Sequence, residues 1–133
     1  MAEPSASAEL GDAAYGSDIK TVTYEADEDI TAGDVVAITS GLVHQADDTT
    51  DTNDFGIAAE DGVDGDNITV YTEGPVVANV ASGVSAGAAL TLSGTDGQLA
   101  AGAGDYQALT DEGAVAGLAA GYGLDANAAV VNF

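Results

Sequence analysis

The sequence has 133 residues and a mass of 12.9 kDa, which suits one domain and is short for two. It carries 23 Asp and Glu against a single basic residue, Lys20, and its formal net charge is −22. That charge excludes electrostatic binding to nucleic acid and to anionic membranes, and the absence of Cys excludes disulfides and thiolate chemistry.

Apolar residues make up 46% of the chain, so the composition is not that of a disordered protein. Most of them are Ala and Val, however, and the chain has two Phe, five Tyr and no Trp. Small side chains bury little area per residue, and burial stabilises a fold by roughly 25 cal/mol per Å². We therefore expect a weak monomeric core that is completed by contact with further copies or with a larger partner.

The excess of acid indicates the solvent in which the protein works. At ~0.1 M salt the Debye length is about 10 Å, and the uncompensated negative charges oppose compaction; near 1 M the length is roughly 3 Å and this penalty largely disappears. The composition resembles that of proteins from salt-accumulating haloarchaea. An acidic surface that meets a basic partner is the alternative explanation.

Residues 1–18 combine Ala, Ser, Gly and acidic residues without a sustained period. We expect them to form an N-terminal arm that is flexible in isolation and ordered only on a neighbour. They also lack the basic start and apolar stretch of a secretory signal, so we expect a soluble protein that is made and used without export.

Residues 19–133 are expected to form a single β domain. Its first strands are predicted where β-branched residues cluster between turn residues. These predicted strands are Ile19–Ala26, Asp34–Ile38, Leu42–Gln45, Phe55–Ala59, Ile68–Thr72 and Val76–Val80.

The chain also repeats itself. Ile30–Thr39 matches Val84–Ser93 at an offset of 54 residues, and Gly56–Ala59 matches Gly117–Ala120 at an offset of 61. Chance similarity in a chain rich in Ala, Gly and Val is the alternative explanation. Duplication predicts an all-β fold, a small barrel or sandwich of short strands with internal pseudo-twofold duplication.

The repeat places the two half-units at about 28–80 and 82–133. It also decides how the C-terminal part is interpreted, where a Gly at every fourth position from Gly113 to Gly121 would otherwise suggest a helix. Each Gly inside a helix costs about 1 kcal/mol relative to Ala. We therefore predict strands at Ala116–Ala120 and Ala128–Phe133.

The sequence offers few residues for chemistry. His44 is the single histidine and lies within a predicted strand, where we expect it to face solvent without a second imidazole or a thiolate for zinc. Two loops, Asp47–Asp54 and Asp61–Asn67, carry oxygen ligands at a density typical of calcium sites. Neither follows the calcium-loop pattern, because Phe55 and Ile68 stand where oxygen ligands are needed. We therefore assign no catalytic residue, no cofactor-binding residue and no metal ligand.

Several segments together resemble one family, the capsid cement or head-decoration proteins of tailed viruses. The resemblance rests on a strand that leads into I-x-A-G-D, a short hairpin, a G-x-A strand, a V-x-V-x-T-x-G strand, and a second half-unit with S-A-G. In this chain the segments are Ile30–Ile38 (ITAGDVVAI), the turn at Ser40–Gly41, Gly56–Ala59 (GIAA), Ile68–Val80 (ITVYTEGPVVANV) and Val84–Leu92 (VSAGAALTL). Members of that family generally carry Lys and Arg, so the charge of this chain points to the version found in a haloarchaeal virus.

The resemblance implies a structural virion protein, not an enzyme, that decorates and stabilises the outer surface of a capsid. It implies the major capsid protein and further copies of the chain, as a homotrimer, as partners. It implies neither nucleic acid nor membrane as a partner, no cofactor, and a location on the capsid exterior. Two other classes stay open from the residues alone: a tail or surface-layer structural module, and a small halophilic calcium-binding or enzyme module.

We predict that folding depends on salt, because a net charge of −22 opposes a core made of small side chains. Circular dichroism is expected to show β structure in 2–3 M KCl (about 3 Å of screening or less) and a lower melting temperature near 0.1 M. An unchanged melting temperature across that range would contradict the prediction.

Overall fold

The computed structural model describes residues 7–8, 10–11, 20–46, 54–113, 123–124 and 126–133. The described residues form twelve short strands and no helix, which confirms the all-β prediction. The strands of the first half-unit are β2 (Thr21–Ala26), β3 (Val35–Thr39), β4 (Leu42–Gln45), β5 (Asp54–Ala58) and β6 (Asn67–Tyr71). Those of the second are β7 (Val76–Asn79), β8 (Ala89–Leu92), β9 (Leu99–Ala101), β10 (Tyr106–Ala108) and β12 (Ala128–Asn132), and the remaining pair is β1 (Ser7–Ala8) and β11 (Gly123–Leu124).

The first half-unit is a closed barrel with the strand order β2-β4-β3-β5-β6. β3 and β4 form a hairpin through Ser40 and Gly41, both of which have positive φ, and β2 pairs with β4 in parallel. The interior is filled by small and β-branched side chains that alternate with outward-facing residues along each strand. These buried residues are Ala26, Ile30, Val36, Val43, Ala58, Ile68 and Val70.

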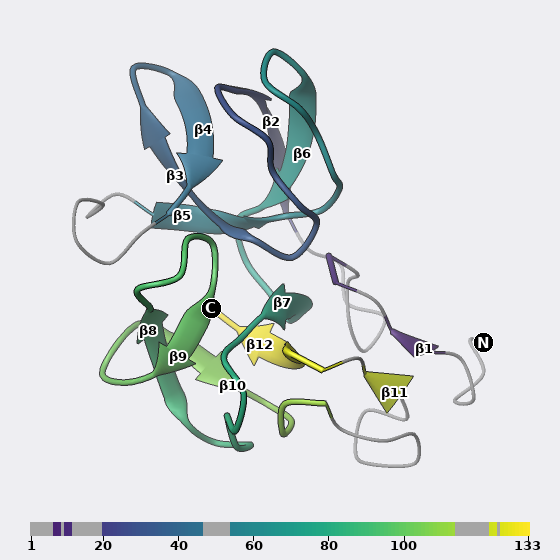
Figure 1. Ribbon diagram of the computed structural model, residues 1–133, viewed down its shortest axis with the longest axis vertical. Helices are drawn as coiled ribbons and strands as arrows, with labels where there is room; N and C mark the ends of the chain where they lie inside the picture. The colour runs from purple at the N-terminus through teal and green to yellow at the C-terminus, as the bar shows by residue number, and fades with distance from the viewer. Residues whose placement is uncertain (1–6, 9, 12–19, 47–53, 114–122, 125) are drawn as a thin grey trace.

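The second half-unit repeats this topology. Its sheet has the order β7-β12-β10-β8-β9, and a parallel bridge between Val80 and Leu99 joins the two ends of that series. The bridge is the counterpart of the Ala26–Val43 pair between β2 and β4. Figure 1 shows the two half-units one above the other, with β1 and β11 beside the second. Each strand of one half-unit therefore has a counterpart in the other.

The strand registers place the boundary of the repeat differently from the sequence comparison. β7 was expected at the end of the first half-unit, but it pairs with β12 and opens the second. The counterpart of β5 is β10, because both lie between the equivalents of β3 and β6. The sequence match had instead assigned this place to Gly117–Ala120, which lies outside the described residues. The strand predicted at Ala128–Phe133 is present as β12.

The same tight turn precedes β3 and β8. Gly33 and Gly87 both have positive φ (92° and 91°), and their N–H groups donate to the carbonyls of Ala58 and Ala108 at 2.8 and 2.7 Å. An L side chain rarely adopts this backbone conformation, so the repeated A-G dipeptide has a structural cause. The turn sets the direction in which β3 and β8 enter their half-units.

The largest core cluster joins the two half-units. It contains the inner residues of the second half-unit together with Val35, Ala37, Ala46 and Ile57, which lie on the outer side of the first barrel. Tyr106 and Phe133 stack at this junction with ring centroids 5.3 Å apart. Since one cluster of fully buried side chains spans both half-units, we expect them to unfold together.

Backbone hydrogen bonds also cross this junction, which we call the seam. Val35 donates to the carbonyl of Gly97 at 2.9 Å, Gly97 donates to Ala46 at 2.8 Å, and Asn79 donates to Gly33 at 2.9 Å. Gly41, in the β3–β4 turn, is the counterpart of Gly97, and it has open space around it. Equivalent residues of the two half-units therefore do not meet at the seam. The seam therefore joins different surfaces of the two half-units.

Part of the segment that was expected to be a free arm contacts the domain itself. Leu10 packs against the outer side of β7 and β12, where Val77, Ala128 and Val130 are fully buried. Gly11 has φ +84° and donates its N–H to the carbonyl of Val77 at 2.8 Å. The other residues of 1–18, apart from Ser7 and Ala8 in β1, lie outside the described part of the chain.

We predict that the close fit of Gly11 stabilises the seam. A Cβ at this position would lie 3.0 Å from the Cβ of Ala32 and 3.0 Å from the carbonyl oxygen of Ala59. Gly11→Ala should therefore lower stability by more than the ~1 kcal/mol that positive φ alone costs. Gly41→Ala is the matched control, because Gly41 has φ +81° and nothing near its Cβ position. Equal shifts in the melting temperatures of the two variants would contradict the prediction.

Candidate functional site

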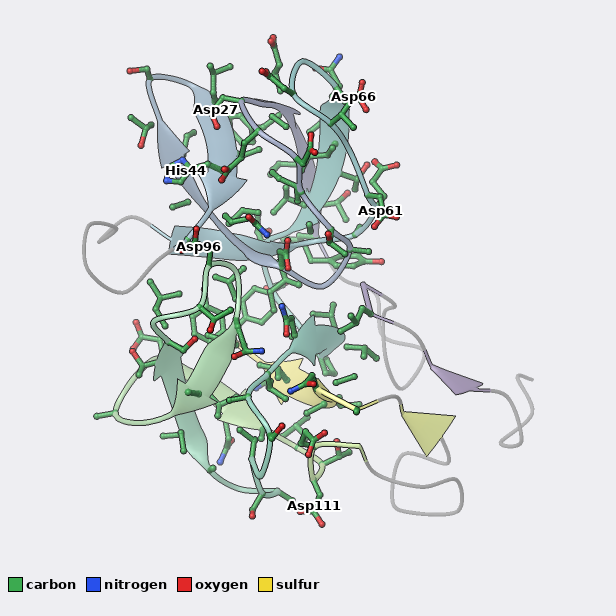
Figure 2. The ribbon with its side chains drawn as sticks, in the orientation of Figure 1. Asp27, His44, Asp61, Asp66, Asp96 and Asp111 are labelled. Atoms are coloured by element: carbon green, nitrogen blue, oxygen red, sulfur yellow. The ribbon has the colours of Figure 1, made fainter. Side chains whose placement is uncertain are left out.

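The acidic residues are divided unequally between the half-units. Fourteen of the 23 Asp and Glu lie within residues 20–73, and five lie within residues 74–133. Figure 2 shows Asp27, Asp61 and Asp66 around the first barrel. A contact that brings this barrel against another acidic surface is opposed by like charge, and the second half-unit, with five acidic residues, opposes such a contact less.

His44 lies on β4. It is half-buried, whereas it was expected to face solvent. It lines an open hollow together with Asp27, Glu28 and Thr39. The Glu28 carboxylate accepts the N–H of Gln45 at 2.8 Å, so one of these carboxylates is used to hold β4. Within the described ranges, no group of three or more His, Asp or Glu is arranged to hold a metal ion.

The carboxylates of the described acidic loop accept hydrogen bonds from backbone N–H groups. Asp61 accepts the N–H of Ala32 at 2.8 Å, and Asp66 accepts the N–H of Val63 at 3.0 Å. The second half-unit repeats the first of these contacts, since Asp111 accepts the N–H of Ala86 at 2.9 Å. Backbone N–H groups thus bind oxygens that a cation would need. The other loop, residues 47–53, lies outside the described part of the chain.

Asp34 is a buried carboxylate at the seam, with 2% of its surface exposed. It accepts the N–H of Thr31 at 2.9 Å, the Gln45 side chain at 2.7 Å and the Asn79 side chain at 3.3 Å. Gln98 extends the network by donating to the Asn79 side-chain oxygen at 3.1 Å. Burial raises the pKa of the Asp34 carboxyl above its ordinary value of 3.8, although these donors favour the charged form. The network joins both half-units through polar side chains.

Glu112 has the opposite environment. Its carboxylate accepts the N–H of Asn127 at 2.6 Å and the N–H of Gly83 at 3.2 Å. These two donors lower the pKa of Glu112 below its ordinary value of 4.5. The side chain fixes the turn before β12, where Asn127 has φ 62°. Like Asp34, it holds backbone segments together, and both of these partners are backbone N–H groups.

These groups do not assemble a reaction centre, and comparison with known proteins agrees with a structural role. A family model described as phage cement protein matches residues 15–132. The chain belongs to this family. The comparison with curated proteins found no match. Family membership makes the chain a structural protein of the phage capsid and associates it with capsid components.

The match extends across both half-units, the closed barrel and the five-stranded sheet that follows it. In this cement-family protein, the I-x-A-G-D motif forms the turn at Gly33 and supplies the buried Asp34. The sequence had indicated the motif but not the role of its carboxylate, because Asn79 and Gln98 are distant in the chain. Among the described residues, no helix is long and apolar enough to cross a membrane.

We predict opposite pH dependence for the two carboxylates. A raised pKa in the folded state contributes stability below pH 3.8 that is lost as the pH rises through the folded value. A lowered pKa contributes stability above pH 4.5 that is lost as the pH falls. Relative to Asp34→Asn, the unsubstituted protein should therefore gain stability on acidification; relative to Glu112→Gln, it should lose stability.

Denaturant unfolding at constant high salt, from about pH 7 to pH 3, measures both differences. Each variant keeps all the other carboxylates, so their titration cancels in the difference in stability between the variant and the unsubstituted protein. The same direction of change for the two variants would show that at least one environment has been assigned wrongly.

Proposed function

We propose that this protein decorates the outer surface of a tailed-virus capsid and stabilises it by bridging neighbouring capsomers. The family match over residues 15–132 is the observation that carries the proposal. The proposed direct partner is the major capsid protein, with further copies of the chain as a homotrimer. The proposal includes assembly in the host cytoplasm, no catalytic activity, and no binding to nucleic acid or membrane.

The charge supports a high-salt environment and a haloarchaeal virus. A net charge of −22 leaves each copy strongly repelled by others at low ionic strength. Three copies on adjacent sites would carry three times that charge, and screening within roughly 3 Å at 1 M salt allows them to approach. The proposed function therefore takes place where salt is concentrated.

The small side chains of the protein support a mechanism based on avidity. The largest exposed apolar side chains among the described residues are Val22 and Val63, which are 37% and 56% exposed and lie on different segments. A single copy therefore offers little apolar area for tight one-to-one binding. Three linked copies that bind together gain effective concentration without any new kind of contact.

We predict strong binding to assembled, expanded shells and weak binding to isolated capsid subunits, because only the lattice presents several sites together. Co-sedimentation in 2–3 M KCl (conditions of nearly complete screening) measures both. Sedimentation equilibrium on the free protein measures whether it is a trimer. Equal binding to free subunits would contradict bridging, and no binding to any shell would contradict capsid decoration and favour a tail component.

A further inference from the structure

The seam buries one outer face of the first barrel. On this face Val35 pairs with Ile57 across β3 and β5, and Ile57 pairs with Tyr71 across β5 and β6. Val35 and Ile57 have no exposed surface, and Tyr71 packs against the same core cluster. The second half-unit therefore packs against the row Val35–Ile57–Tyr71.

The second half-unit has the same row in the same register. Ala89 pairs with Gln107 across β8 and β10, and Gln107 pairs with Asn132 across β10 and β12. All three residues are exposed. The next positions correspond as well, with Thr91 and Gly102 in the places of Ala37 and Ala46. We call the row Ala89–Gln107–Asn132 the β8–β10–β12 face.

The chemistry of this face differs from that of its counterpart in one respect. Apolar residues that bury permanently in the first barrel are replaced by an alanine and two side-chain amides. Amides donate and accept hydrogen bonds without carrying charge, so they can exchange water for protein partners reversibly. Asp105, in the turn before β10, is the single acidic residue between Gly97 and Thr110. The face is thus polar and nearly uncharged in a strongly acidic protein.

The face lies on the half-unit that carries fewer acidic residues. Figure 1 shows β8, β10 and β12 in the lower half-unit and the strands of the acidic barrel above them. None of the fourteen acidic residues of residues 20–73 belongs to the β8–β10–β12 face. No carboxylate on the row itself has to lose its hydration when a partner covers the face.

We propose that the β8–β10–β12 face docks on the outer surface of the assembled capsid shell. This inference rests on the proposed function. The fold already uses the corresponding surface of the first barrel to bind a protein unit, and the face in the second half-unit is exposed and free of charge. The shell surface that it fits is uncharged and offers backbone or side-chain hydrogen-bonding groups.

The test introduces single negative charges without changing side-chain shape. Gln107→Glu and Asn132→Asp each place a carboxylate on the face, and Asn67→Asp is the matched control on the exposed start of β6 in the acidic barrel. Each variant has the same net charge. Circular dichroism and melting in high salt confirm that the three variants fold equally well before binding is measured.

Co-sedimentation of each full-length variant with expanded shells gives the result. Gln107→Glu and Asn132→Asp are each expected to weaken binding by at least about tenfold, the effect of losing roughly 1.4 kcal/mol. Asn67→Asp is expected to bind like the unsubstituted protein. If either face variant fails to fold, Gln107→Ala, which removes the amide and adds no charge, replaces it and is expected to weaken binding in the same direction.

The outcomes separate this inference from the proposed function. If the unsubstituted protein binds shells and the face variants bind equally well, the docking face is wrong and capsid decoration stands. If the face variants bind shells normally but change the oligomeric state, the face joins copies of the chain and the inference is overturned. If the unsubstituted protein binds no shell, both proposals fail.

Discussion

The fold depends on how a single buried carboxylate is satisfied. Asp34 lies where the first barrel meets the second half-unit, and it receives hydrogen bonds from a turn, from β4 and from the end of β7. A buried charge without partners would cost several kcal/mol, so these three segments can adopt only arrangements that deliver their donors. The apolar contacts around the seam are non-directional, so they fix its geometry less tightly than hydrogen bonds do. The polar network therefore specifies the geometry that the weak apolar core stabilises.

Much of the first half-unit could be predicted from its residues, because its strands combine β-branched side chains with clear turns. β3, β4 and β6 lie within about one residue of their predicted positions. β9 and β10 were not predicted, since LAA and YQA are short and carry no β-branched residue. Their strand structure comes from pairing with β8 and β12, which a local pattern does not contain. The match between Gly56–Ala59 and Gly117–Ala120 also gave a counterpart of β5 that differs from the one in the strand order, because short Ala-Gly segments resemble one another wherever they occur.

The functional residues, too, could be predicted only in part from the sequence. Sequence alone identified the motif at Ile30–Asp34 and assigned no metal or catalytic role to His44, but it could not place Asn79 or Gln98 beside Asp34. Nor could it distinguish the outer faces of the two half-units, because exposure depends on which strands cover which. Val35 and Ala89 occupy equivalent strand positions, yet one is buried and the other is exposed. Only the assembled seam creates that difference.

The seam has a consequence for how such a protein can arise from a duplicated unit. When identical units join through non-equivalent surfaces, each added unit offers a free surface to the next. The series then grows into an open filament, or into a ring where the rotation between units closes. In this chain the series stops at two, because the second unit lacks the apolar row that the first unit uses. Ile57 and Tyr71 have the amides Gln107 and Asn132 as their counterparts. The difference between the two rows thus leaves a terminated pair of half-units with one polar end.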